Sequence, residues 1–156
     1  MPTFTATNGV PVTIPGTDVI RMRDAYPEES TQTNAKCRID HPGVQFVTED
    51  ANTVVPAVKA ENSYIGQLTL PTTKPVWFNG TVSRGPIRLV SGHHPAARSA
   101  LYIGDKIQYV TEMPEEVRTA IEAAGGNALP IPSEGFFASI ASAVVDRFSA
   151  APEVWD

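Results

Sequence analysis

The sequence has one cysteine, no long apolar run and no targeting signal. Cys37 is the only cysteine in 156 residues, so no disulfide can form within the chain, as is typical of a reducing compartment. A disulfide between two chains stays open. No apolar run has the length needed to cross a bilayer, and the first residues lack the basic and apolar regions of a signal peptide. We expect a protein made in the cytoplasm, not secreted through a signal peptide, and without membrane contact.

Charge is also scarce, and basic residues are the scarcer kind. The chain has 12 Lys and Arg against 17 Asp and Glu, a net charge of −5. Nucleic acid requires a clustered basic surface, so it is not an expected partner. Arg84, Arg88, Arg98 and Lys106 are interpreted as a solvated face. Hydrophobic residues make up 42% of the chain, enough for a core, and 14 prolines exclude a bundle of long helices.

Motifs of catalysis and of cofactor or metal binding are missing. The sequence has no Gly-x-Ser-x-Gly elbow, no phosphate-binding glycine loop and no zinc-binding helix. His93-His94 is interpreted as a solvated loop, because no cysteine or carboxylate lies near it at metal-ligand spacing. Cys37 and His41 would face the same side of a strand, which leaves a thiol enzyme as a minor hypothesis. We predict no catalytic residue, metal, cofactor or small-molecule substrate.

The chain does contain an internal repeat. Gln45–Glu49 recurs as Gln108–Glu112, an offset of 63 residues from position 45 to 108. Pro11-Val12 recurs as Pro75-Val76, an offset of 64 from position 11 to 75, and Gly16-Thr17 recurs as Gly80-Thr81. Within this register Cys37 aligns with Leu101, which favours a buried apolar role for the cysteine. The constant register predicts two copies of one module that pack together.

Each copy is expected to form short strands followed by one closing helix. In the first helix Asp50 or Asn52 can cap, and Pro56 must fall within the first turn or the helix breaks. Pro114 begins the second helix and Gly125-Gly126 ends it. The predicted strands are 12–14, 19–23, 36–39 and 44–48 in the first copy, and 76–78, 87–90, 100–103 and 107–111 in the second, with Ser63–Leu70 matching Thr3–Thr7 as an opening strand.

These elements predict an α+β fold, mostly β. We expect a first antiparallel-sheet module over residues 1–62, a second over 63–126, and a linker with a C-terminal amphipathic helix over 127–156. That helix either covers a module or docks on another subunit. One of Trp77 and Phe78 is a candidate to face outward as a contact residue, while a core aromatic is the favoured interpretation. The predicted partner-binding residues are Trp77, Phe136, Phe137, Ile140, Val144 and Phe148, with Val145 on the same helical stripe.

The repeat resembles the small flagellar FlbD-like protein family. Asn8-Gly9-Val10-Pro11-Val12-Thr13-Ile14 matches the family's opening strand, and Val110-Thr111-Glu112-Met113-Pro114-Glu115-Glu116-Val117 matches its closing helix start. The resemblance implies two or three further strands in each module, and the family has no established catalytic residues to transfer. This chain departs from the family in having two copies, a long approach to the third strand from Tyr26 to Ala35, and a further C-terminal helix.

These features favour a non-enzymatic structural protein that binds copies of itself or a major assembly protein. A virion component, such as a capsid decoration or accessory protein, is the concrete hypothesis. The alternative is a bacterial adaptor or regulatory protein of the flagellar type that binds one protein partner. A thiol enzyme using Cys37 and His41 is the third hypothesis.

Overall fold

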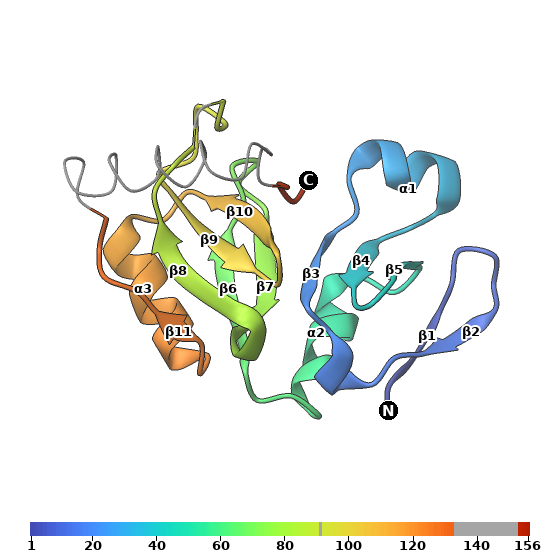
Figure 1. Ribbon diagram of the computed structural model, residues 1–156. Coiled ribbons are helices and arrows are strands. Elements are labelled where there is room, and N and C mark those ends of the chain that lie inside the picture. Colours follow the sequence, from blue (N-terminus) through green and yellow to red (C-terminus); the bar gives the residue numbers. More distant parts are fainter. Residues whose placement is uncertain (91, 133–152) are drawn as a thin grey trace.

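The computed structural model describes residues 1–90, 92–132 and 153–156, and its fold is α+β with mostly strands, as predicted (Figure 1). The first half contains β1 Thr3–Thr5, β2 Pro11–Thr13, η1 Gly16–Asp18, β3 Arg21–Asp24, α1 Pro27–Thr33, β4 Cys37–Asp40, β5 Val44–Val47 and α2 Ala51–Lys59. The second half contains β6 Ile65–Thr69, β7 Pro75–Asn79, η2 Gly80–Val82, β8 Ser83–Ile87, β9 Ser99–Ile103, β10 Lys106–Val110, α3 Pro114–Ala123 and β11 Asn127–Ala128. The predicted C-terminal helix lies outside the described residues.

The two halves repeat the same order of elements, with α1 inserted in the first. They also repeat a side-chain contact. The Glu49 carboxylate accepts hydrogen bonds from the Thr5 backbone N–H at 2.9 Å and from the Thr5 hydroxyl at 3.1 Å. The Glu112 carboxylate accepts from Thr69 N–H at 2.9 Å and from the Thr69 hydroxyl at 2.8 Å. The repeated glutamate therefore ties the opening strand of each half to the start of its closing helix.

Removing either glutamate is expected to destabilise the fold by a similar amount. Glu49→Ala and Glu112→Ala each leave a partly buried threonine N–H without its acceptor, which costs roughly 1–3 kcal/mol of unfolding free energy. Urea denaturation followed by circular dichroism measures the loss. Glu115→Ala, at an exposed position of α3, is the matched control and should change stability by less than about 0.5 kcal/mol. A large loss for only one of the two glutamates would show that the contacts are not equivalent.

The repeated glycines are explained by a close approach of the chain. A Cβ on Gly16 would lie 2.7 Å from Glu61 Cβ and 3.0 Å from the Val58 carbonyl oxygen, beside the end of α2. A Cβ on Gly80 would overlap the Ala124 carbonyl group at the end of α3. Only glycine lets the short η helix pack so closely on the helix end in each half.

The halves are joined through one sheet. A five-stranded sheet has the order β5-β4-β3-β7-β6, so three strands come from the first half and two from the second. β3 and β7 are antiparallel, with Met22 opposite Trp77. A four-stranded sheet has the order β10-β9-β8-β11, and β1 pairs with β2 separately. Figure 1 shows β3 on one side of β7, and β8 and α3 on the other. The boundary at residues 62 and 63 stays a prediction, and hydrogen bonds of the shared sheet cross it.

Strand β7 is buried on both faces. Trp77 belongs to the hydrophobic cluster of the first half, which includes Val54 and Val58 of α2. Val76 and Phe78 point the opposite way, into the cluster that contains Ile121 of α3. Trp77 is 9% exposed and Phe78 is fully buried, so the hypothesis that one of them faces outward is wrong. The reason is that the hairpin of β6 and β7 contributes to the hydrophobic clusters of both halves, one on each face.

Two predicted elements of the first half need correction. The long approach Tyr26–Ala35 contains a helix that the sequence analysis did not predict, because α1 occupies Pro27–Thr33. Its start, Pro27-Glu28-Glu29, carries the same signal that marked Pro114-Glu115-Glu116. Pro56 lies well inside α2, beyond the first turn, and the helix continues to Lys59. Pro56 is on the exposed side, while the opposite face is held by buried valines, so the missing backbone donor does not end the helix.

Two details of the repeat alignment also change. The predicted strand 87–90 is displaced, since β8 runs over Ser83–Ile87. Cys37 lies opposite Val47, and in the second half Ser99 lies opposite Val110, so Ser99 occupies the place of Cys37. The alignment with Leu101 was therefore two residues out of register. Leu101 is fully buried, as Cys37 is, so the conclusion that the cysteine is a core residue is unaffected.

Candidate functional site

Three arginines form a cluster on one face of the five-stranded sheet. Arg21 and Arg23 are two residues apart on β3, so their side chains leave the same face. Arg38 on β4 lies directly opposite Arg23, and Asp40 lies opposite Arg21. The intervening Met22 and Ile39 point into the hydrophobic core on the other face. Arg21 and Arg23 are 0% exposed, which is rare for arginine and requires charged partners.

Two carboxylates from the same half neutralise part of this charge. Asp40 accepts from Arg21 Nε at 2.8 Å and from Arg38 Nε at 2.9 Å. Glu29 of α1 accepts from Arg23 Nη1 at 2.9 Å and from Arg23 Nη2 at 3.2 Å. Three guanidiniums thus face two carboxylates, and a buried positive charge remains. An uncompensated buried charge is costly, so the cluster needs a further anion.

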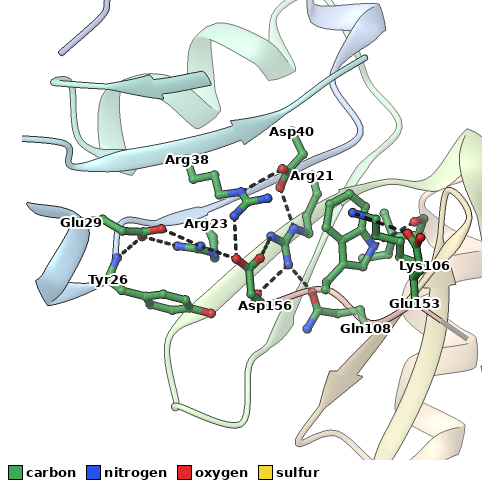
Figure 2. Close-up of polar contacts among 12 residues, drawn as sticks. Arg21, Arg23, Tyr26, Glu29, Arg38, Asp40, Lys106, Gln108, Glu153 and Asp156 are labelled. Carbon is green, nitrogen blue, oxygen red and sulfur yellow. Dashed lines mark hydrogen bonds and ion pairs between the residues drawn. The ribbon is translucent and has the colours of Figure 1, made fainter. Parts of the chain in front are cut away.

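Asp156 supplies that anion from far along the chain. Its Oδ2 accepts from Arg38 Nη1 at 2.8 Å and lies 3.7 Å from Arg23 Nη2. Its Oδ1 accepts a longer bond, 3.4 Å, from Arg21 Nη2, and its backbone oxygen accepts from Arg21 Nη1 at 3.1 Å. Figure 2 shows the carboxylate between the three guanidinium groups, with Gln108 of β10 accepting from Arg21 at 2.7 Å. The arginines that hold Asp156 come from the first half, and Gln108 of the second half bonds to one of them, Arg21.

The residues before Asp156 are bound through their backbone and an indole ring. We call Glu153–Asp156 the docked segment. Ile107 N–H donates to the Glu153 carbonyl at 2.9 Å, and Trp155 N–H donates to the Ile107 carbonyl at 2.8 Å, which adds the segment to the edge of β10 in parallel. Trp155 Nε1 donates to the Ile103 carbonyl at 3.0 Å.

The Trp155 ring is also covered by cations. The Arg21 guanidinium lies 4.3 Å and Lys106 Nζ lies 4.6 Å from ring centroids of the indole. Both distances are within the range of a cation–π interaction, which strengthens when the cation is desolvated, as Arg21 is. Arg21 thus contacts both the indole and the aspartate of the docked segment.

Charge in the cluster shifts the ionisation of Asp156. Partial burial by itself raises the pKa of the Asp156 carboxyl, but the charges of Arg38, Arg23 and Arg21 outweigh burial, and the pKa lies below its ordinary value. Burial lowers the pKa of the Arg21 guanidinium, and Asp40 offsets only part of that effect. Asp156 is therefore ionised at neutral pH, in the form that the arginines bind.

A small cavity of about 150 Å³ adjoins the docked segment. Tyr26, Leu70, Pro71 and His94 are among the residues that line it, together with Trp155. Sites for drug-sized ligands usually measure roughly 300–1,000 Å³, so this cavity is too small for one. The geometry at the arginine cluster suits an extended peptide with an aromatic and an acidic side chain.

The residues that the sequence singled out lie elsewhere. Trp77 is in the core, and Phe136, Phe137, Ile140, Val144 and Phe148 lie outside the described residues. His93 and His94 are exposed and bond locally, His93 Nδ1 with the Val90 carbonyl and His94 Nδ1 with Ala96 N–H. Within the part of the chain that the structure describes, no three His, Cys, Asp or Glu side chains gather as metal ligands.

Sequence reasoning missed the arginine cluster, although a signal was present. Arg21-Met22-Arg23 and Arg38-Ile39-Asp40 each alternate charged and apolar residues, as half-buried strands do. Two such strands side by side place their charges on one face. That the face is buried, and that Asp156 reaches it, could not be inferred from this alternation.

Cys37 does not have the surroundings of a nucleophile. It is fully buried, and its Sγ lies 3.8 Å from the Arg38 carbonyl oxygen. Burial is the main reason that the pKa of the thiol rises to about 12. The thiolate is the reactive form of cysteine, so this environment argues against the thiol-enzyme hypothesis.

A pH dependence of stability follows from this thiol. Between about pH 9 and pH 12 the folded chain keeps the thiol proton that the unfolded chain has lost, so stability falls as pH rises, by up to about 1.4 kcal/mol per pH unit. Urea denaturation of the native chain and of Cys37→Ala over this range measures the difference, since other groups titrate in both. Identical pH profiles for the two chains would contradict the raised pKa.

Comparisons with protein families, with curated proteins and with solved structures found no match. The resemblance to the FlbD-like family therefore stays a prediction. Among the described residues, no helix has the length and apolar character needed to cross a membrane.

Proposed function

We propose that this chain is a non-enzymatic assembly protein that acts through protein–protein contacts. The observation that carries the proposal is the docking of Glu153–Asp156. Addition of an extended segment to a sheet edge, an aromatic anchor and a carboxylate held by arginines are recurring means of peptide recognition. The chain combines all three on one short segment. A surface that recognises a peptide in this way is suited to joining protein components.

The side chains around the segment support binding rather than a reaction. Among the described residues they include guanidiniums, the Lys106 ammonium, carboxylates, the amide of Gln108 and the ring of Tyr26. Each guanidinium is engaged by a carboxylate in a fixed geometry, which gives directional recognition of a carboxylate. The same groups would hold an acidic peptide from another molecule as well as one from this chain.

A virion accessory protein, such as a capsid decoration protein, is our concrete proposal for the assembly. The compact, acidic two-part chain and its peptide-docking surface support it. Native mass spectrometry of the purified chain, together with co-sedimentation with particles of its parent assembly, tests it. We expect several copies bound to each particle. A chain that stays monomeric and binds no particle would contradict the proposal, and a single cellular partner bound one to one would favour the adaptor alternative.

A further inference from the structure

We infer that the docked segment of one copy also binds the arginine cluster of a second copy, so that copies associate by exchanging Glu153–Asp156. The inference rests on the proposed function and names a second copy of this chain as the partner. The first observation behind it is that the docked segment carries its own binding groups. Four residues provide the pairing with β10, the indole contacts and the carboxylate.

Among the described residues, the hydrophobic clusters are built without the docked segment. The three hydrophobic clusters are built from buried residues between Phe4 and Ala124. Trp155 only packs against the second cluster as a partly buried side chain. The segment can therefore leave its own body while both halves keep their cores.

When the docked segment leaves, the arginine cluster favours binding of the same segment from another copy. Without Asp156, the carboxylate partners of Arg21, Arg23 and Arg38 among the described residues are Asp40 and Glu29. The same segment from a second copy restores every bond that was lost. Exchange of an identical element between protomers needs no new surface, which makes it a low-cost route to association.

The docked segment is distant in sequence from the rest of the described chain. The sequence places 20 residues, 133–152, between the last described residue of the body and Glu153. Docking within one chain competes with docking between copies, so exchange is favoured where copies are crowded, as on the surface of a particle.

A pair of charge-reversed variants tests exchange between copies, because in neither variant can the docked segment bind the arginine cluster of its own chain. In Asp156→Lys the altered segment is repelled by its own arginines, and in Arg38→Glu the altered cluster repels its own Asp156. Mixed in equal amounts, each segment finds a matching cluster only on the other variant. We expect each variant alone to be monomeric at tens of micromolar, and the mixture to form a one-to-one heterodimer in native mass spectrometry.

The double variant Arg38→Glu/Asp156→Lys is the matched control, because it restores pairing within one chain and should stay monomeric. The indole N–H signal of Trp155 in an NMR spectrum reports docking, since Trp155 Nε1 donates to Ile103. A mixture that remains monomeric while the double variant docks would overturn the inference. Particle binding by the unaltered chain would then still support the proposed function.

A second measurement covers the case in which Arg38→Glu does not fold. Sedimentation of the unaltered chain and of Asp156→Lys is measured from micromolar to millimolar concentration. Asp156→Lys reverses a charge on the docked segment and leaves the arginine cluster unaltered. We expect association of the unaltered chain to rise with concentration and that of Asp156→Lys to be at least tenfold weaker. Equal association of the two chains would overturn the inference.

Discussion

Asp40→Ala is expected to lower the free energy of unfolding by about 3–5 kcal/mol, a large part of the total stability of a domain. Asp40 is 1% exposed and accepts from the Nε atoms of both Arg21 and Arg38. Its removal leaves the buried guanidiniums of Arg21 and Arg38 without the carboxylate that they share. The repulsion among the three arginine charges is then offset less. Urea denaturation followed by circular dichroism and by fluorescence gives the loss.

Two matched variants separate charge from packing. Asp40→Asn keeps the size and one oxygen of the side chain and removes the charge, so it should fall between the native chain and Asp40→Ala. Asp105→Ala removes an exposed aspartate from the turn between β9 and β10 and should change stability by less than about 0.5 kcal/mol. If Asp40→Ala were as stable as Asp105→Ala, the cluster would not be buried as the structure has it.

Trp77→Ala is expected to lower the free energy of unfolding by about 3–5 kcal/mol, as truncation of a large core aromatic does. Trp77 comes from the second half but packs in the hydrophobic cluster of the first half. Its loss therefore removes apolar contacts across the junction of the halves, beside the pairing with Met22. Urea denaturation measures the loss, and both halves should unfold in one transition.

Trp155→Ala is the matched control, because the chain has only two tryptophans. Trp155 lies on the docked segment and is partly buried, so its truncation should weaken docking and self-association with a smaller loss of stability. The opposite pattern, in which Trp77→Ala leaves stability unchanged and weakens association, would return Trp77 to the role of a contact residue that the sequence suggested.

The internal repeat of residues 45–49 at 108–112 was the sequence feature that predicted most of the fold. It identified the order of strands and the two closing helices, because a repeated module must bury the same apolar positions twice. It did not predict α1, since the same Pro-Glu-Glu start signal at Pro27 falls in a segment with no counterpart in the second copy. Nor did it predict the shared sheet, because pairing of β3 with β7 is decided by contacts distant in sequence.

By itself, the sequence determined most of the local elements, with α1 and the position of β8 as exceptions, because alternation, capping residues and glycines act over a few positions. Only the tertiary structure decided which faces are covered and which charges meet. Trp77 became a core residue, and Arg21, Arg23 and Arg38 became a cluster that contacts Asp156, because burial and Coulomb energy depend on distance in space. Asp156 lies 118 residues beyond Arg38, and no local pattern could connect the two.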